Sequence, residues 1–162
     1  VKLANNEPFK NPIYISEDMY NLYSKKYTVP KEEDILITGV GTLGITYLVK
    51  KNDKFYFKDG NIIWLKKKDT NINSNYMESV FKSPFVRAQI TNSIGATVGT
   101  LTIQKAKELL IPYPSLEIQN KIMNKINNLF IYLNDFEKNL QKNIDNYIAL
   151  KNSLIKNYLD SK

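Results

Sequence analysis

Positively charged side chains are concentrated in one stretch of this sequence. Between Lys50 and Lys68 there are seven lysines and two aspartates, an excess of five positive charges. Residues 1–114 together carry 16 basic and 11 acidic side chains, also an excess of five, so this stretch explains their whole surplus. Lysines in the turns beside adjacent strands would place positive charge on one edge of a small sheet, where phosphates bind. Six lysines are therefore candidate phosphate contacts, namely Lys50, Lys51, Lys54, Lys66, Lys67 and Lys68.

If these phosphates belong to DNA, recognition of its individual bases would need other side chains. Arg87, the only arginine, suits guanine, whereas Gln89 or Asn92 suits adenine, and the hydroxyls of Ser93 and Thr97 suit either. The sequence does not show which of these side chains share a face. A solvated hairpin surface without a ligand is the alternative explanation of the lysines.

Residue types needed for catalysis are scarce. The sequence has no histidine and no cysteine, which removes the commonest general base and the thiolate. Metal-dependent nuclease sites of the restriction type need a carboxylate followed two residues later by lysine, and this spacing does not occur before residue 160. The run Asn11-Pro12-Ile13-Tyr14 resembles the N-P-P-Y motif of amino-methyltransferases but lacks its second proline. We expect no catalytic residue, no metal site and no cofactor, and hence a protein that binds rather than cuts.

A glycine-rich run, Gly39-Val40-Gly41-Thr42-Leu43-Gly44, matches the dinucleotide-binding pattern G-x-G-x-x-G. That site requires a helix after the third glycine, but residues 45–49 are β-branched and aromatic and predict a strand. We therefore interpret the run as a tight turn between two strands. A backbone surface that approaches a phosphate is the alternative.

The sequence pattern predicts helices and short strands that would position these side chains, in an α+β fold with a small mixed sheet. Ser16 is a good N-cap, followed by acidic residues in the first helical turn and basic residues in the last. Ser83-Pro84 is typical of an N-cap with proline at the first helical position. The spacing predicts helices over 17–26, 75–81 and 84–90, and strands over 13–15, 35–38, 45–49, 55–57, 62–65, 101–103 and 109–111.

The last third of the chain predicts one long helix, from about residue 116 to about 158. After Pro114 there is neither proline nor glycine, and apolar residues alternate at spacings of four and three, which is typical of a coiled-coil seam. The seam is interrupted at Asn143 and resumes afterwards. We expect a domain over 1–113 and a spacer or dimerisation helix over 114–162, although a helix that folds back on its own domain is an alternative. The expected helix-pairing residues are Ile122, Ile126, Leu129, Leu133, Phe136, Leu140, Tyr147 and Leu154.

The junction between these two regions resembles a known family. The run over residues 109–122, which contains IPYPSLEIQ, resembles the junction in specificity subunits of type I restriction-modification systems. Ser115 stands where the family commonly has a second proline, and Ile118-Gln119 replaces Glu-Gln. Asp34-Ile35-Leu36-Ile37-Thr38, followed by the glycine turn, also resembles that family.

The resemblance implies a non-catalytic subunit that recognises double-stranded DNA and directs methylation and restriction by partner subunits. Such subunits carry two recognition domains and two long helices, which pair antiparallel and bind the modification subunits and, indirectly, the restriction subunit. One half is present here, so the second recognition half belongs either to the same chain or to a homodimer. Two other interpretations stay open: the recognition domain of a single-chain restriction-methyltransferase, and a helical interaction module that does not bind DNA.

Apolar segments give no indication of a membrane partner. No apolar run approaches 18 residues and no signal-peptide pattern is present, so we expect a cytoplasmic protein.

Overall fold

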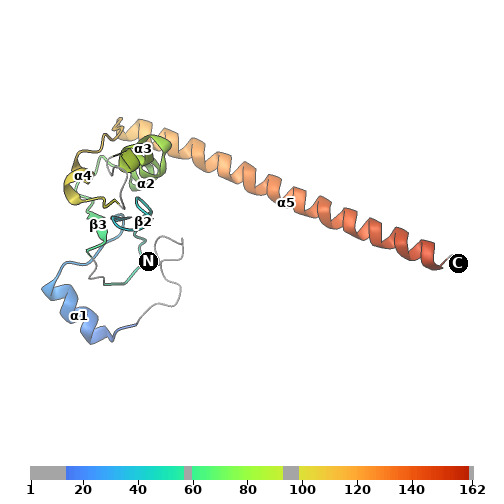
Figure 1. Ribbon diagram of the computed structural model, residues 1–162, viewed down its shortest axis with the longest axis horizontal. Coiled ribbons are helices and arrows are strands. Elements are labelled where there is room, and N and C mark those ends of the chain that lie inside the picture. Colours follow the sequence, from blue (N-terminus) through green and yellow to red (C-terminus); the bar gives the residue numbers. More distant parts are fainter. Residues whose placement is uncertain (1–13, 57–59, 93–98, 161–162) are drawn as a thin grey trace. The chain divides into compact units, whose positions relative to one another are not determined.

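The computed structural model describes residues 14–56, 60–92 and 99–160, and it divides the chain into two compact units, Val1–Asn120 and Lys121–Lys162. Figure 1 shows helices and short strands in the order of the sequence. The elements are α1 (Glu17–Lys26), β1 (Ile35–Thr38), β2 (Thr46–Leu48), β3 (Ile62–Leu65), α2 (Ser74–Lys82), α3 (Pro84–Asn92), α4 (Ile103–Lys107) and α5 (Leu116–Asp160). The α+β class is confirmed.

The three strands form one antiparallel sheet in the order β2-β1-β3. In the centre of the sheet, Leu36 lies opposite Tyr47 on one side and Trp64 on the other. All four residues of β1 are buried, as expected for a central strand whose two faces are both covered. Helix α2 packs against β2 and against α3, and the core continues through Val86 and Leu101.

A buried carboxylate connects the start of β1 with the end of β3. Asp34 accepts hydrogen bonds from the backbone N–H of Lys31, the indole N–H of Trp64 and the backbone N–H of Lys67, each at 2.9 Å. These three donors satisfy a group that would otherwise be costly to bury. The edge of the sheet next to the lysine-rich segment is thereby fixed.

The expected starts of the helices over 17–26 and 84–90 are confirmed. The Ser16 hydroxyl accepts a hydrogen bond from the N–H of Met19 at 3.2 Å, and α3 begins at Pro84. The glycine run is a turn between β1 and β2, as expected, and Gly41 and Gly44 adopt positive φ angles of 74° and 71°. Glycine adopts this conformation without the steric cost that a side chain would bring.

Several expected strands are wrong. Residues 101–103 are not a strand, because the Thr102 hydroxyl accepts a hydrogen bond from the N–H of Lys105 at 3.2 Å and starts α4. Residues 109–111 also lie outside the sheet, and the Leu110 backbone pairs with a side chain instead. Tyr14-Ile15 and Phe55-Tyr56 belong to no strand either, while the remaining residues of those two expected strands, Ile13 and Phe57, lie outside the described part.

The expected long helix is confirmed. Helix α5 is continuous over 45 residues (Figure 1), which corresponds to about 68 Å at 1.5 Å per residue. It begins immediately after Ser115, whose carbonyl accepts the first helical hydrogen bond, from the N–H of Gln119 at 3.0 Å. Its first five residues belong to the first unit and the rest form the second.

Candidate nucleic-acid interface

The segment around Lys50 and Lys51 is a turn held by Asp53. The Asp53 carboxylate accepts hydrogen bonds from the backbone N–H of Lys50 and from the Tyr47 hydroxyl, both at 2.7 Å. Burial, and then the bond to Asp53, raise the pKa of Tyr47, so this phenol stays protonated and donates. The side chains of Lys50 and Lys51 are exposed and form no ion pair with any described residue. They are therefore available for an anionic ligand.

Lys54 is engaged with α1. Its ammonium group lies 2.5 Å from a carboxylate oxygen of Glu17 and 5.0 Å from the centroid of the Tyr20 ring. The bond to Lys54 lowers the pKa of Glu17, and the same bond raises the pKa of Lys54. Tyr23 stacks on Tyr56 with 4.9 Å between ring centroids, a second contact between α1 and this segment. Lys54 would have to leave Glu17 to contact a phosphate fully.

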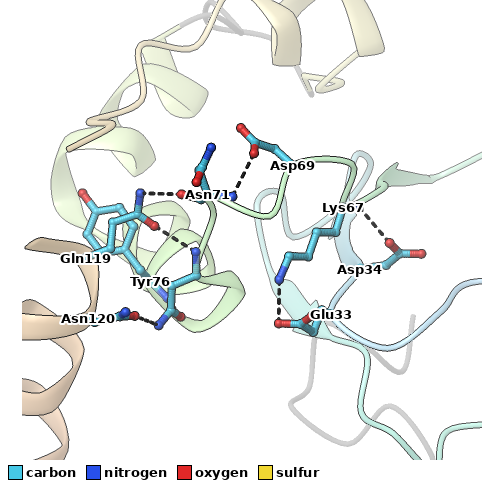
Figure 2. A network of polar contacts seen from close by, with 9 residues as sticks. Glu33, Asp34, Lys67, Asp69, Asn71, Tyr76, Gln119 and Asn120 are labelled. Atoms are coloured by element: carbon cyan, nitrogen blue, oxygen red, sulfur yellow. Dashed lines mark hydrogen bonds and ion pairs between the residues drawn. The ribbon is translucent and has the colours of Figure 1, made fainter. Parts of the chain in front are cut away.

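The second group of lysines follows β3, and its three members have different surroundings. The ammonium of Lys66 lies 4.1 Å from the centroid of the Trp64 ring and donates to the Thr28 hydroxyl at 3.2 Å. Lys67 forms an ion pair of 2.8 Å with Glu33, as Figure 2 shows. Lys68 is exposed and has no ion pair with the described residues. Lys66 and Lys68 thus add to the positive charge that no carboxylate of the described residues pairs with.

An apolar cavity of about 350 Å³ opens beside Lys66 and Lys67 in the first unit. Its remaining lining is largely aliphatic and aromatic, and includes Leu65, Met77 and Phe81. Glu33 also lines the cavity and its carboxylate would repel a phosphate, so this mostly apolar cavity does not suit that ligand.

Three of the expected base-contacting residues, Arg87, Gln89 and Asn92, lie on α3. The Arg87 guanidinium donates from Nη1 to the carbonyl of Leu43 at 2.9 Å. The amide of Gln89 pairs with the backbone of Leu110, accepting its N–H at 2.9 Å and donating to its carbonyl at 3.0 Å. A bidentate contact of Gln89 with adenine would have to replace this pair. The side chain of Asn92, together with Ser93 and Thr97, lies outside the described part, so no geometry joins them to Arg87.

Gln119, to which the sequence analysis assigned no structural role, makes several of the hydrogen bonds that hold the junction together. Its buried amide donates to the carbonyl of Asn71 at 3.2 Å, as Figure 2 shows. The same amide accepts the N–H of Asn73 at 2.9 Å and donates to the carbonyl of Pro114 at 2.8 Å. Asn73 also caps α2, through a bond from the N–H of Tyr76. The first turn of α5 is therefore fastened to the N-terminus of α2. The position of Gln119 next to the expected helix start was the only signal that could have indicated this role.

In the second unit, the expected helix-pairing residues differ in exposure. Ile122 and Ile126 are partly buried. The exposed fraction of the other six lies between 46% and 74%, a large value for apolar side chains: Leu129, Leu133, Phe136, Leu140, Tyr147 and Leu154. They leave an apolar stripe along α5 uncovered in the isolated chain.

Neither an acidic cluster suited to a metal ion nor a membrane-spanning helix occurs in the part of the chain that the structure covers. Within 14–56, 60–92 and 99–160, no three acidic residues gather in a way that would hold a metal ion. No helix in these ranges combines the length and the apolarity needed to cross a bilayer.

Comparison with known proteins identifies the family. The family model described as "Type I restriction modification DNA specificity domain" matches residues 2–146, most of the chain. The chain belongs to this family. A relative from Haemophilus influenzae, described as a candidate type I restriction enzyme specificity subunit, is 32% identical over 114 residues. The alignment covers 70% of this chain and 28% of that relative, so the chain spans less than a third of the relative's length.

Membership agrees with what the residues indicated. The type I specificity family is non-catalytic and concerns DNA recognition in restriction-modification, which confirms the expected resemblance and the non-enzymatic class. Neither comparison assigns a role to an individual side chain. The lysines, the α3 residues and the helix-pairing residues therefore stay predictions.

Proposed function

We propose that this chain binds one half-site of double-stranded DNA in a sequence-specific way, and so directs methylation and restriction by partner subunits. Family membership supports a DNA ligand. The observation that carries the proposal is the set of exposed lysines without a carboxylate partner among the described residues, namely Lys50, Lys51 and Lys68, together with Lys66. Uncompensated ammonium groups release counterions from DNA when they bind phosphates, which favours binding.

In this proposal the two regions of the chain have separate roles. Residues 1–113 form the recognition domain and residues 114–162 the spacer helix. The exposed apolar stripe of α5 supports pairing with the helix of a second recognition half, because a coiled-coil seam buries such side chains. That half is either a further part of the same polypeptide or a second copy. A second copy would imply recognition of a split palindrome.

Salt-dependent DNA binding tests the lysine assignment. Replacing Lys66, Lys67 and Lys68 by Gln should weaken binding to duplexes of any sequence. The slope of the logarithm of the binding constant against the logarithm of the salt concentration should become less steep by up to about three. The measurement is fluorescence anisotropy with a random-sequence duplex at several salt concentrations.

The control variant removes the same charge from α5, by replacing Lys138, Lys142 and Lys151 with Gln. Its salt slope should stay close to that of the wild type. Unchanged affinity in the first variant would remove these lysines from the interface. A wild-type protein that binds no duplex at low salt would instead favour a helical interaction module.

A further inference from the structure

The turn between β1 and β2 contains four successive backbone N–H donors without an acceptor among the described residues. The N–H groups at the end of the turn are paired: the Gly44 N–H donates to the Thr38 carbonyl at 2.9 Å, and the Ile45 N–H donates to the Thr38 hydroxyl at 3.0 Å. The Thr38 hydroxyl in turn donates to the Thr42 carbonyl. The N–H groups of residues 40–43 have no acceptor among the described residues. The donors of the exposed residues Gly41 and Thr42 lie in the middle of this run, between the partly buried Val40 and Leu43.

The surface of this turn is open at its tip. Gly41 and Thr42 are exposed, and a Cβ atom added to Gly41 would meet no atom within 4 Å. The positive φ angle of Gly41 departs from the extended backbone, in which successive N–H groups alternate in direction. Successive N–H groups in such turns form concave sites for anions.

Arg87 adds a positive charge at the same place. Its Nη1 is fastened to the Leu43 carbonyl at 2.9 Å, and a Cβ atom on Gly44 would come within 2.8 Å of Nη1, so the guanidinium lies directly against the turn. Arg87 is partly buried, and no carboxylate of the described residues forms an ion pair with it. A guanidinium has five N–H donors, so most of them stay available after the bond to Leu43.

The chemistry of these groups indicates one kind of ligand. The turn presents successive N–H donors that have no acceptor among the described residues, and Arg87 adds a positive charge beside them. A phosphate offers acceptors together with a full negative charge, whereas a base edge in the major groove, including the N7 and O6 acceptors of guanine, carries no net charge. The hydrogen bond to Leu43 also limits how far the guanidinium can extend. A bidentate contact with guanine would need the guanidinium to extend further.

We propose that the N–H groups of residues 40–43 and the guanidinium of Arg87 together bind one phosphate of the DNA backbone. This inference rests on the proposed function and changes the role expected for Arg87 from base reading to positioning on the phosphate backbone. The glycine run then serves as part of the binding surface as well as a strand connection.

Substitution of Arg87 distinguishes the two roles. Arg87→Met should weaken binding to a random-sequence duplex several-fold and reduce the salt slope by about one, because one phosphate contact is lost. Arg87→Lys, which keeps the charge, should retain most of the slope. The control Lys142→Met removes one positive charge from α5 and should leave the slope almost unchanged. An Arg87→Met variant that loses only its preference among sequences, with an unchanged slope, would overturn the phosphate assignment in favour of base reading.

A measurement on the wild-type protein covers the case in which Arg87→Met fails to fold. In ¹H–¹⁵N spectra, the amide resonances of residues 40–43 should shift on titration with the same random-sequence duplex. Unshifted resonances, under conditions where anisotropy shows binding, would overturn this inference and leave the proposed function intact. A wild-type protein without any duplex binding would overturn both.

Discussion

The amide of Gln119 is fully buried and satisfies three backbone groups, in Asn71, Asn73 and Pro114. Replacing it by Leu would leave one N–H and two carbonyls without their partner, and each lost bond to a buried group costs about 1–3 kcal/mol. We expect Gln119→Leu to lower the free energy of unfolding of the first unit by about 3 kcal/mol, allowing for partial relaxation. Urea unfolding followed by the fluorescence of Trp64 measures this change.

Gln104 provides the matched control. It is exposed, and its amide donates only to Glu108 at 3.0 Å. Gln104→Leu should change the unfolding free energy by less than about 0.5 kcal/mol. Equal effects of the two substitutions would mean that the Gln119 contacts do not stabilise the junction.

A carboxylate in the same region gives a pH dependence with a definite sign. Asp69 accepts the N–H of Asn71 at 2.8 Å and the Tyr113 hydroxyl at 2.9 Å. These bonds, that of Asn71 first, lower the pKa of Asp69 in the folded protein below its ordinary value. The stabilisation is therefore complete above the pKa of the unfolded chain, near pH 4, and is lost as the pH falls through the folded value.

Asp69→Asn should accordingly be less stable than the wild type at pH 7, and the difference should shrink as the pH falls below about 4. Thermal unfolding between pH 2 and pH 7 measures it. Tyr113→Phe, which removes one of the two hydrogen bonds to Asp69, should also be less stable than the wild type at pH 7, but by a smaller amount than Asp69→Asn. A difference that stays constant over the whole pH range would contradict this explanation.

At the scale of elements, α5 contains a polar residue at a seam position. Asn143 is exposed in the isolated chain and lies in register with the apolar residues that precede and follow it. A polar seam residue usually selects register or orientation at a cost in stability. If α5 pairs with a second helix, Asn143→Leu should therefore strengthen the pairing and loosen its specificity, visible as a shift in the oligomers seen by sedimentation velocity.

The control for this change is Asn152→Leu, at a position on the opposite side of the heptad from the seam. It should leave the oligomeric state as in the wild type. If Asn143→Leu leaves it unchanged as well, Asn143 has no role in pairing, whereas the broader function stands.

The elements that the sequence predicted best are those with local signals. Ser16 marks a helix start through a hydrogen bond to a nearby backbone N–H, and Pro84 marks another through its fixed φ angle. The apolar seam of α5 is a local signal that repeats over many turns. The strand expected over 101–103 failed because the Thr102 cap outweighed the β-branched residues, a competition that composition does not reveal.

Long-range contacts were beyond such local reasoning. The bonds from Gln89 to Leu110 and from Gln119 to Asn71 and Asn73 join residues 21 to 48 positions apart, so no local pattern indicates them. Likewise, the sequence grouped six lysines, but only the structure shows that Lys54 and Lys67 already have carboxylate partners. The lysine cluster as a whole could be predicted, and the availability of its members could not.

At the scale of the whole molecule, the chain combines a lysine-rich unit with a long helix that bears an uncovered apolar stripe. Charge alone gives affinity for any DNA, because phosphate contacts carry no sequence information. Specificity needs base contacts or a dependence on DNA shape as well. The proposed function therefore requires a preference among sequences in addition to binding.

Selection of bound duplexes from a randomised pool tests this central claim most directly. The full chain should enrich one short motif, and if two copies pair through α5, the motif should recur as two inverted copies at a fixed separation. Binding without an enriched motif, or no binding at low salt, would contradict sequence-specific recognition by this chain.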